Sequence, residues 1–118
     1  MKNIILVFIL GGLGSLLRWT LYVMLPKAFL ATLCVNLLGS FALGFAGQNK
    51  FIAIKLALSQ NEFNLLCLSF IGAFTTFASF QGDMIKLFET QKLIAILYLA
   101  ISLLGGLILF LLGRQLAS

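Results

Sequence analysis

The sequence predicts an all-α membrane protein with four transmembrane helices in a single domain that spans residues 1–118. Of the 118 residues, 62% are hydrophobic and only 9% are charged, which is more apolar surface than a soluble domain of this length can bury. Four apolar runs are each about as long as the ~20 residues that a helix needs to cross the hydrocarbon core. A membrane β-barrel would show alternating strands of about half that length. The four runs are Ile4–Leu25, Phe29–Gly47, Phe63–Gly82 and Leu93–Gly113.

The first run contains the only charged residue in any of the four, Arg18. Two interpretations of this arginine stay open. Trp19 and Tyr22 are typical of a membrane interface, toward which an arginine side chain can extend. Alternatively, Arg18 is a fixed positive charge at the mouth of an anion path.

The second run has a polar stripe, because Thr32, Asn36, Ser40 and Gly44 stand four residues apart and share one helix face. An amide at membrane depth needs a partner, since leaving it unpaired there is costly. A single asparagine would favour a hydrogen bond that holds two helices together. The whole stripe of small and polar groups favours a wet path instead.

The third run contains the stretch Gly72–Phe80, in which glycine and hydroxyl residues weaken the helix near its middle. A break in the helix is therefore predicted there, and a non-helical backbone at this depth must be buried in protein or line a wet cavity. Phe77 and Phe80 stand three apart and project from one face, flanked by the hydroxyl groups of Thr76 and Ser79. Packing is the usual role of phenylalanine in a span, but this setting favours a pore lining.

The remaining polar residues give weaker signals. Within residues 48–61, the helical spacing of Phe51, Ile54 and Leu58 predicts either a short amphipathic helix at the surface or an extension of a neighbouring span. Asp83 is expected to lie at a solvated helix end near Lys86. In the fourth run, a hydroxyl such as that of Ser102 most often bonds to its own preceding turn.

The basic residues are divided almost evenly between the two sides of the membrane, which predicts no fixed orientation. Two copies inserted in opposite directions could then pair about an axis in the membrane plane, so an antiparallel homodimer with dual topology is expected. One side collects Lys2, Lys50, Lys55 and Arg114, and the other collects Lys27, Lys86 and Lys92, with Arg18 if it extends that way.

The composition excludes several function classes. An enzyme is not expected, because the chain has no histidine, no acid pair at membrane depth and no phosphate-binding glycine loop. Scattered basic residues argue against a nucleic-acid partner. A small dual-topology multidrug exporter that exchanges cations for protons is the main alternative, but it needs a carboxylate at membrane depth. A structural subunit would leave the polar stripe unexplained. Hydroxyl and amide donors with positive ring edges suit a small anion.

Three stretches on three spans resemble the Fluc (CrcB) family of fluoride channels, in the same order along nearly the whole chain. They are Gly11-Gly12-Leu13-Gly14-Ser15-Leu16-Leu17-Arg18-Trp19, Thr32-Leu33-Cys34-Val35-Asn36-Leu37-Leu38-Gly39-Ser40-Phe41 and Gly72-Ala73-Phe74-Thr75-Thr76-Phe77-Ala78-Ser79-Phe80. The last stretch departs from the family pattern at Ala78, which removes one pore hydroxyl group, and an aspartate, Asp83, follows where a glutamate is common.

The resemblance implies passive fluoride export across the bacterial cytoplasmic (inner) membrane by an antiparallel homodimer with two pores. It implies that Phe77 and Phe80 line the pore, with Asn36 and Ser102 hydrogen-bonding nearby. It also implies that backbone carbonyl groups of Gly72 and Thr75 hold one sodium ion shared by the two subunits. Thr32, Thr76 and Ser79 complete the expected polar lining, and Arg18 the expected charge at the pore mouth.

Overall fold

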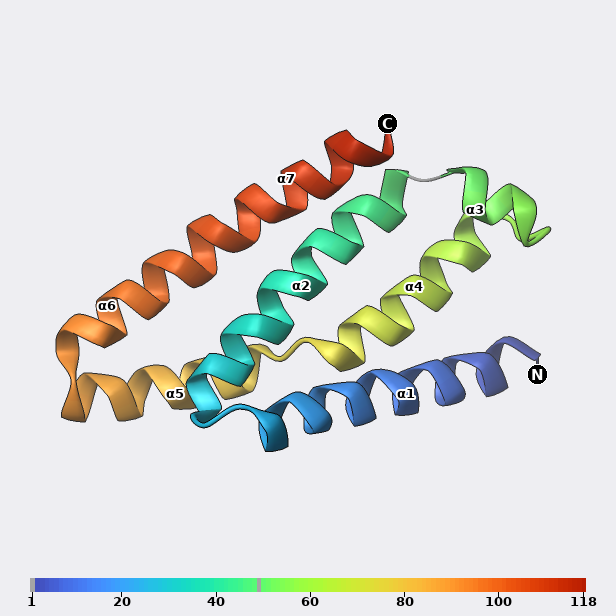
Figure 1. The fold of residues 1–118 in the computed structure, drawn as a ribbon. Helices are drawn as coiled ribbons and strands as arrows, with labels where there is room; N and C mark the ends of the chain where they lie inside the picture. Colours follow the sequence, from blue (N-terminus) through green and yellow to red (C-terminus); the bar gives the residue numbers. More distant parts are fainter. Residues whose placement is uncertain (1, 49) are drawn as a thin grey trace.

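The computed structural model describes residues 2–48 and 50–118, so residues 1 and 49 of the predicted domain lie outside the described part. Every regular element in the described part is a helix (Figure 1). The elements are α1 (Lys2–Met24), α2 (Ala28–Gln48), α3 (Lys50–Lys55), α4 (Gln60–Phe74), α5 (Phe77–Thr90), α6 (Lys92–Ala100), the π-helix η1 (Ile101–Gly105) and α7 (Gly106–Ala117).

Four helical segments among the described residues are long and apolar enough to cross a membrane, which confirms the predicted fold class at this level. The third segment, Gln60–Thr90, is longer than the charge-free run that predicted it. It begins early because Ser59 and Glu62 form a capping box at the start of α4. It ends late because α5 continues through charged residues as far as Thr90.

Two close helix pairs organise the bundle: α2 lies along α7, and α1 lies along α4 (Figure 1). Glycines allow the close approach. A Cβ atom at Gly44 would collide with the carbonyl group of Phe110, and one at Gly113 with that of Phe41. A Cβ atom at Gly14 would likewise collide with the backbone of α4 at Phe70. Small residues therefore bring these backbones into direct contact, as is typical of membrane helices.

The main cluster of buried side chains packs α5 against α6, and other buried residues, such as Val35 of α2 and Ile71 of α4, lie outside it. The cluster contains Phe80, Leu87, Ala95 and Tyr98, each at most 8% exposed. Most other large apolar side chains are exposed, for example Phe8 at 82%. Such a surface is stable in lipid, because acyl chains are as apolar as the side chains they cover.

The connection between α2 and α4 contains a short helix, α3, which includes Phe51 and Ile54 as predicted but ends at Lys55, before Leu58. The fourth span contains a feature that was not predicted, the π-helical turn η1, in which Ser102 lies. Single π-helical turns inside α-helices are frequent at functional sites.

Candidate functional site

The helix stops between α4 and α5, where Thr75 (φ −85°, ψ 162°) and Thr76 (φ −151°, ψ 117°) are extended. Their hydroxyl groups serve the helix ends on either side. Thr75 Oγ1 donates to the carbonyl oxygen of Ile71 at 3.1 Å, and Thr76 Oγ1 accepts from the N–H of Ser79 at 3.3 Å. Thr76 is thus the N-cap of α5, a position that hydroxyl residues favour. We call Thr75 and Thr76 the break.

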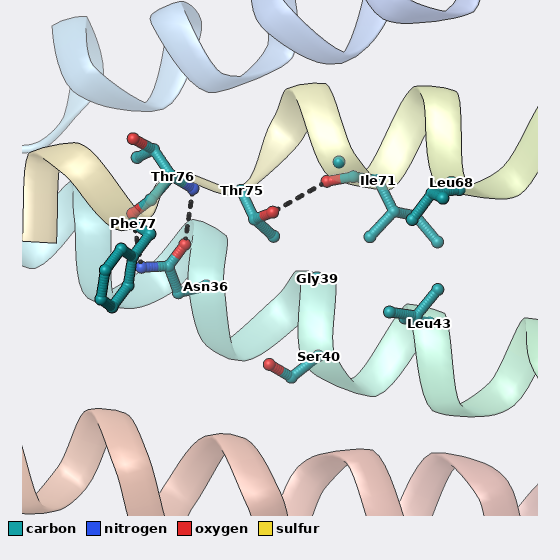
Figure 2. Close-up of a pocket in the computed structure, with 10 residues that line it drawn as sticks. Asn36, Gly39, Ser40, Leu43, Leu68, Ile71, Thr75, Thr76 and Phe77 are labelled. Carbon is teal, nitrogen blue, oxygen red and sulfur yellow. Dashed lines mark hydrogen bonds between the residues drawn. The ribbon is translucent and has the colours of Figure 1, made fainter.

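Asn36 of α2 binds the backbone of the break with both ends of its amide (Figure 2). Its Oδ1 accepts from the N–H of Thr76 at 2.8 Å, and its Nδ2 donates to the carbonyl oxygen of Thr76 at 3.1 Å. The N–H of Thr76 lacks the partner that a continuous helix would supply, whereas its carbonyl group, at the N-cap of α5, also accepts the first hydrogen bond within that helix. Asn36, on a neighbouring span, therefore gives the N–H of Thr76 its hydrogen-bond partner.

The guanidinium group of Arg18 also reaches the break. Its Nη1 donates to the carbonyl oxygen of Thr75 at 3.4 Å, so α1 places a positive charge next to the extended backbone. The side chain is partly buried, whereas its neighbour Trp19 is 65% exposed. The Arg18 side chain therefore lies against the break, and its role as a charge at a pore mouth stays a prediction.

A cavity of about 280 Å³ lies against the break, between α2 and α4 (Figure 2). It brings together five of the site residues expected from the sequence: Asn36, Gly72, Thr75, Thr76 and Phe77. Its remaining lining is mostly apolar and consists of Gly39, Ser40, Leu43, Leu68 and Ile71. Gly39 is needed here, because a Cβ atom at this position would collide with the methyl group of Thr75.

The two phenylalanines lie side by side but in different surroundings. Their ring centroids are 6.0 Å apart. Phe77 is 68% exposed and borders the cavity, whereas Phe80 is 8% exposed and packs on Tyr98 with centroids 5.2 Å apart. Only Phe77 is therefore accessible from the cavity within a single subunit.

Three further expected residues lie outside this cavity. Ser79 accepts a hydrogen bond from Thr76 Oγ1 at 3.2 Å, which ties it to the break. Thr32 is fully buried, shares a hydrogen bond with the Tyr22 hydroxyl group and donates to the carbonyl oxygen of Ala28 at 3.2 Å. The Ser102 hydroxyl group is buried without a hydrogen-bond partner among the described residues, so the expected bond to its own preceding turn is absent.

Sequence reasoning missed Tyr98, whose hydroxyl group donates to Asp83 Oδ2 at 3.3 Å. The expectation that Asp83 lies at a solvated helix end near Lys86 is wrong, because α5 continues past it and its carboxylate, which is partly buried, faces Tyr98. One signal could have found the tyrosine. Tyr98 stands four residues before Ser102 and so shares its helix face.

The donors around the break are uncharged apart from Arg18. The uncommitted donors are the second amide hydrogen of Asn36 and the ring edge of Phe77, which can attract an anion without holding it as a fixed ion pair would. Among the described residues, no group of three histidine, cysteine or acidic side chains could hold a metal ion. A cation here would need backbone oxygens, and the Gly72 carbonyl group is a candidate because its helical partner, the N–H of Thr76, is bound to Asn36.

Comparison with known proteins identifies the family of this chain. Residues 5–114 match the family described as "CrcB-like protein, Camphor Resistance (CrcB)". The chain is 38% identical over 113 residues to "Fluoride-specific ion channel FluC 2" of Listeria innocua, covering 93% of this chain and 86% of the relative. It is 35% identical over 121 residues to "Fluoride-specific ion channel FluC" of Desulfovibrio desulfuricans, covering 96% and 90%. The protein therefore belongs to the CrcB (Fluc) family of multi-pass membrane proteins.

Proposed function

We propose that this protein is a fluoride-selective channel that lets cytoplasmic fluoride leave the cell by passive diffusion. The observation that carries the proposal is the cavity at the break, where the second amide hydrogen of Asn36 and the exposed ring edge of Phe77 can face an anion and no carboxylate lines the wall. The names of the relatives supply the identity of the ion. Fluoride holds its water tightly, so a path for it must replace hydration with many donors.

The working unit in this proposal is an antiparallel homodimer with two pores, inserted with dual topology in the bacterial cytoplasmic membrane. One subunit leaves the cavity and Phe77 uncovered, so a second copy would close the wall. Phe80 and Ser102 complete the path from within each subunit. The orphaned hydroxyl group of Ser102 supports this role, because a buried polar group without a partner is costly unless a ligand uses it.

A sodium ion at the dimer interface fits the residues present. The Gly72 carbonyl group lacks its helical partner, and nothing lies within 4 Å of the position where a Gly72 side chain would begin. The Thr75 carbonyl oxygen accepts one bond from Arg18 and retains a second lone pair. Two carbonyl groups from each of two copies would surround a hard cation with oxygen, which such cations prefer. The nearby guanidinium charge weakens the attraction without removing it.

The test of the function is ion release from liposomes that contain the purified protein. With a potassium gradient and a potassium ionophore, fluoride electrodes should record rapid efflux and chloride electrodes almost none. The multidrug exporter is the second candidate, and it predicts proton release on addition of an organic cation. Proton exchange without fluoride efflux would overturn the channel assignment.

A further inference from the structure

The short helix α3 lies at the membrane boundary. It connects α2 to α4, which belong to consecutive spans, so both of its ends are close to the same membrane surface. Figure 1 shows it at the end of the bundle, near the end of α2 and the start of α4. Neither the break nor the cavity involves this helix, so the proposed channel function leaves it without a role.

One face of α3 is apolar and uncovered. Phe51 is 70% exposed and Ile54 is 76% exposed, and they stand three apart on one face. Ala53, by contrast, is only 3% exposed and faces the protein. Two large neighbouring apolar side chains at this exposure are more stable when apolar groups cover them, because covering removes their surface from water. Something apolar must cover them.

Positive charge flanks this apolar face. Lys50 and Lys55 stand at the two ends of α3, and the Lys55 ammonium group lies 5.9 Å from the centre of the Phe51 ring. Arg114 borders a cavity with Gln48 at the same end of the bundle. The nearest acid along the chain, Glu62, caps the start of α4 and is one negative charge against the three positive charges of Lys50, Lys55 and Arg114. The surface around α3 is therefore basic.

We propose that α3 is an interfacial anchor that binds anionic phospholipid, with Phe51 and Ile54 among the acyl chains and Lys50 and Lys55 on the phosphate groups. Lysine side chains extend naturally from an apolar depth to a headgroup. Basic residues close to a membrane surface attract anionic lipid, and aromatic residues place a helix in the interface. A headgroup layer matches apolar and basic groups on one short helix, whereas a protein partner with an apolar patch would leave the lysines unmatched.

The experiment uses one tryptophan as a depth probe in the full-length protein. Trp19, the only tryptophan, is changed by Trp19→Phe, and the probe is introduced by Phe51→Trp. The protein is reconstituted in vesicles that contain brominated lipid. Bromine close to the headgroup should quench the probe strongly, and bromine near the chain end should quench it weakly. A matched probe at Leu107→Trp, which is 57% exposed in α7, should show the reverse.

Lipid charge is then tested at fixed bromine position. Brominated phosphatidylglycerol diluted in phosphatidylcholine is compared with brominated phosphatidylcholine diluted in phosphatidylglycerol. The ratio of the two quenching efficiencies should be well above one, and it should fall to about one after Lys50→Gln with Lys55→Gln, because two surface charges are lost. The Leu107 probe should give equal quenching by both lipids.

Two results would overturn the proposal. Absence of quenching at position 51 would mean that protein or water, not lipid, covers α3. Quenching without a preference for phosphatidylglycerol, or a preference that survives the lysine changes, would show that Lys50 and Lys55 do not bind anionic headgroups. These readouts need no ion flux, so they stand or fall independently of the fluoride channel.

Discussion

Asn36, on a neighbouring span, binds both the N–H and the carbonyl group of Thr76 where the helix stops, and the N–H has no other partner there. The sequence left two roles open for this residue, a link between helices and a lining of a wet path. The geometry is compatible with both. The amide nitrogen carries two hydrogens, of which one is used by Thr76, and the other remains for the cavity that Asn36 lines.

Replacing this amide should destabilise the fold as well as stop conduction. We expect Asn36→Leu to lower the free energy of unfolding by about 1–3 kcal/mol, because the N–H of Thr76 at membrane depth loses its partner. Chemical unfolding in detergent measures the loss. Ser40→Ala is the control, since Ser40 lines the same cavity one turn further along α2. An Asn36→Leu protein as stable as the unchanged protein would contradict this assignment.

Substitutions of Phe77 and Phe80 should both slow fluoride efflux but should differ in their effect on stability. Phe77→Ile should leave stability unchanged, because the ring is mostly exposed, and should sharply slow fluoride efflux. Phe80→Ile should also slow efflux but lower the free energy of unfolding by about 1–3 kcal/mol, because the smaller side chain leaves a gap against Tyr98. Liposome flux and thermal unfolding of each variant provide the measurements.

The lipid-facing ring of Phe8 provides the control for these variants, because it is 82% exposed and distant in sequence from the break. Phe8→Ile should change neither flux nor stability. If the Phe77→Ile, Phe80→Ile double variant folds and conducts fluoride at the original rate, the rings serve only packing.

At the scale of the helices, paired glycine contacts fix how α2 lies on α7. Gly44 contacts the backbone of α7 at Phe110, and Gly113 contacts the backbone of α2 at Phe41. Each helix therefore has one glycine, which we call its notch, where the backbone of the other helix fits. The crossing is therefore rigid at backbone level. This rigidity holds α2, and with it Asn36, at a defined position opposite the break.

Adding one methyl group at either notch should separate the helices. We expect Gly113→Ala and Gly44→Ala each to reduce stability by about 1–3 kcal/mol, because backbone cannot yield as a flexible side chain can. Gly47→Ala is the matched control on α2, since nothing lies within 4 Å of its Cβ position. Unfolding of the three variants in detergent tests the contact, and equal stability of all three would disprove it.

At the scale of the whole molecule, a substitution at Gly72 distinguishes the stability of a single chain from the formation of the proposed dimer. Nothing in one subunit lies near its Cβ position, so Gly72→Leu should not harm the fold of a single chain. In the proposed dimer it should block close approach and shift the equilibrium toward monomers. Single-molecule photobleaching in liposomes measures this shift.

Two variants complete this test. Gly82→Leu is the control for side-chain size, because Gly82 is equally open but lies in α5 beyond the break. Thr75→Val should leave dimerisation intact, because it keeps both the carbonyl group and the methyl group that packs on Gly39. If Gly72→Leu dimerises normally, a close contact between copies at this position is wrong.

Orientation in the membrane should follow the basic residues at the two ends of the bundle. Reporter fusions at the carboxyl end should detect both orientations in one culture, because neither end has an excess of lysine and arginine. Gln48→Lys with Ser118→Lys adds two charges to one end, since both residues border the same cavity, and should leave one orientation and reduce fluoride efflux. A single orientation of the unchanged protein would rule out antiparallel pairing.

The sequence by itself determined the fold class, the four spans and the stretch where the third helix is weak. Each depends on local composition: runs of apolar residues long enough for a bilayer, and glycine with two threonines where hydroxyl groups compete for backbone partners. The position of Asn36 on a polar stripe was equally local. The family resemblance followed from the same short stretches.

Only the tertiary structure decided which residues meet. Asn36 and Thr76 are 40 residues apart, and Arg18 and Thr75 are 57 apart, so no local pattern pairs them. The different exposure of Phe77 and Phe80, the contact of Asp83 with Tyr98 and the π-helical turn at Ser102 were likewise unpredictable. The physical reason is the solvent. Lipid is as apolar as a protein core, so the hydrophobic pattern of a spanning helix does not reveal which face turns inward.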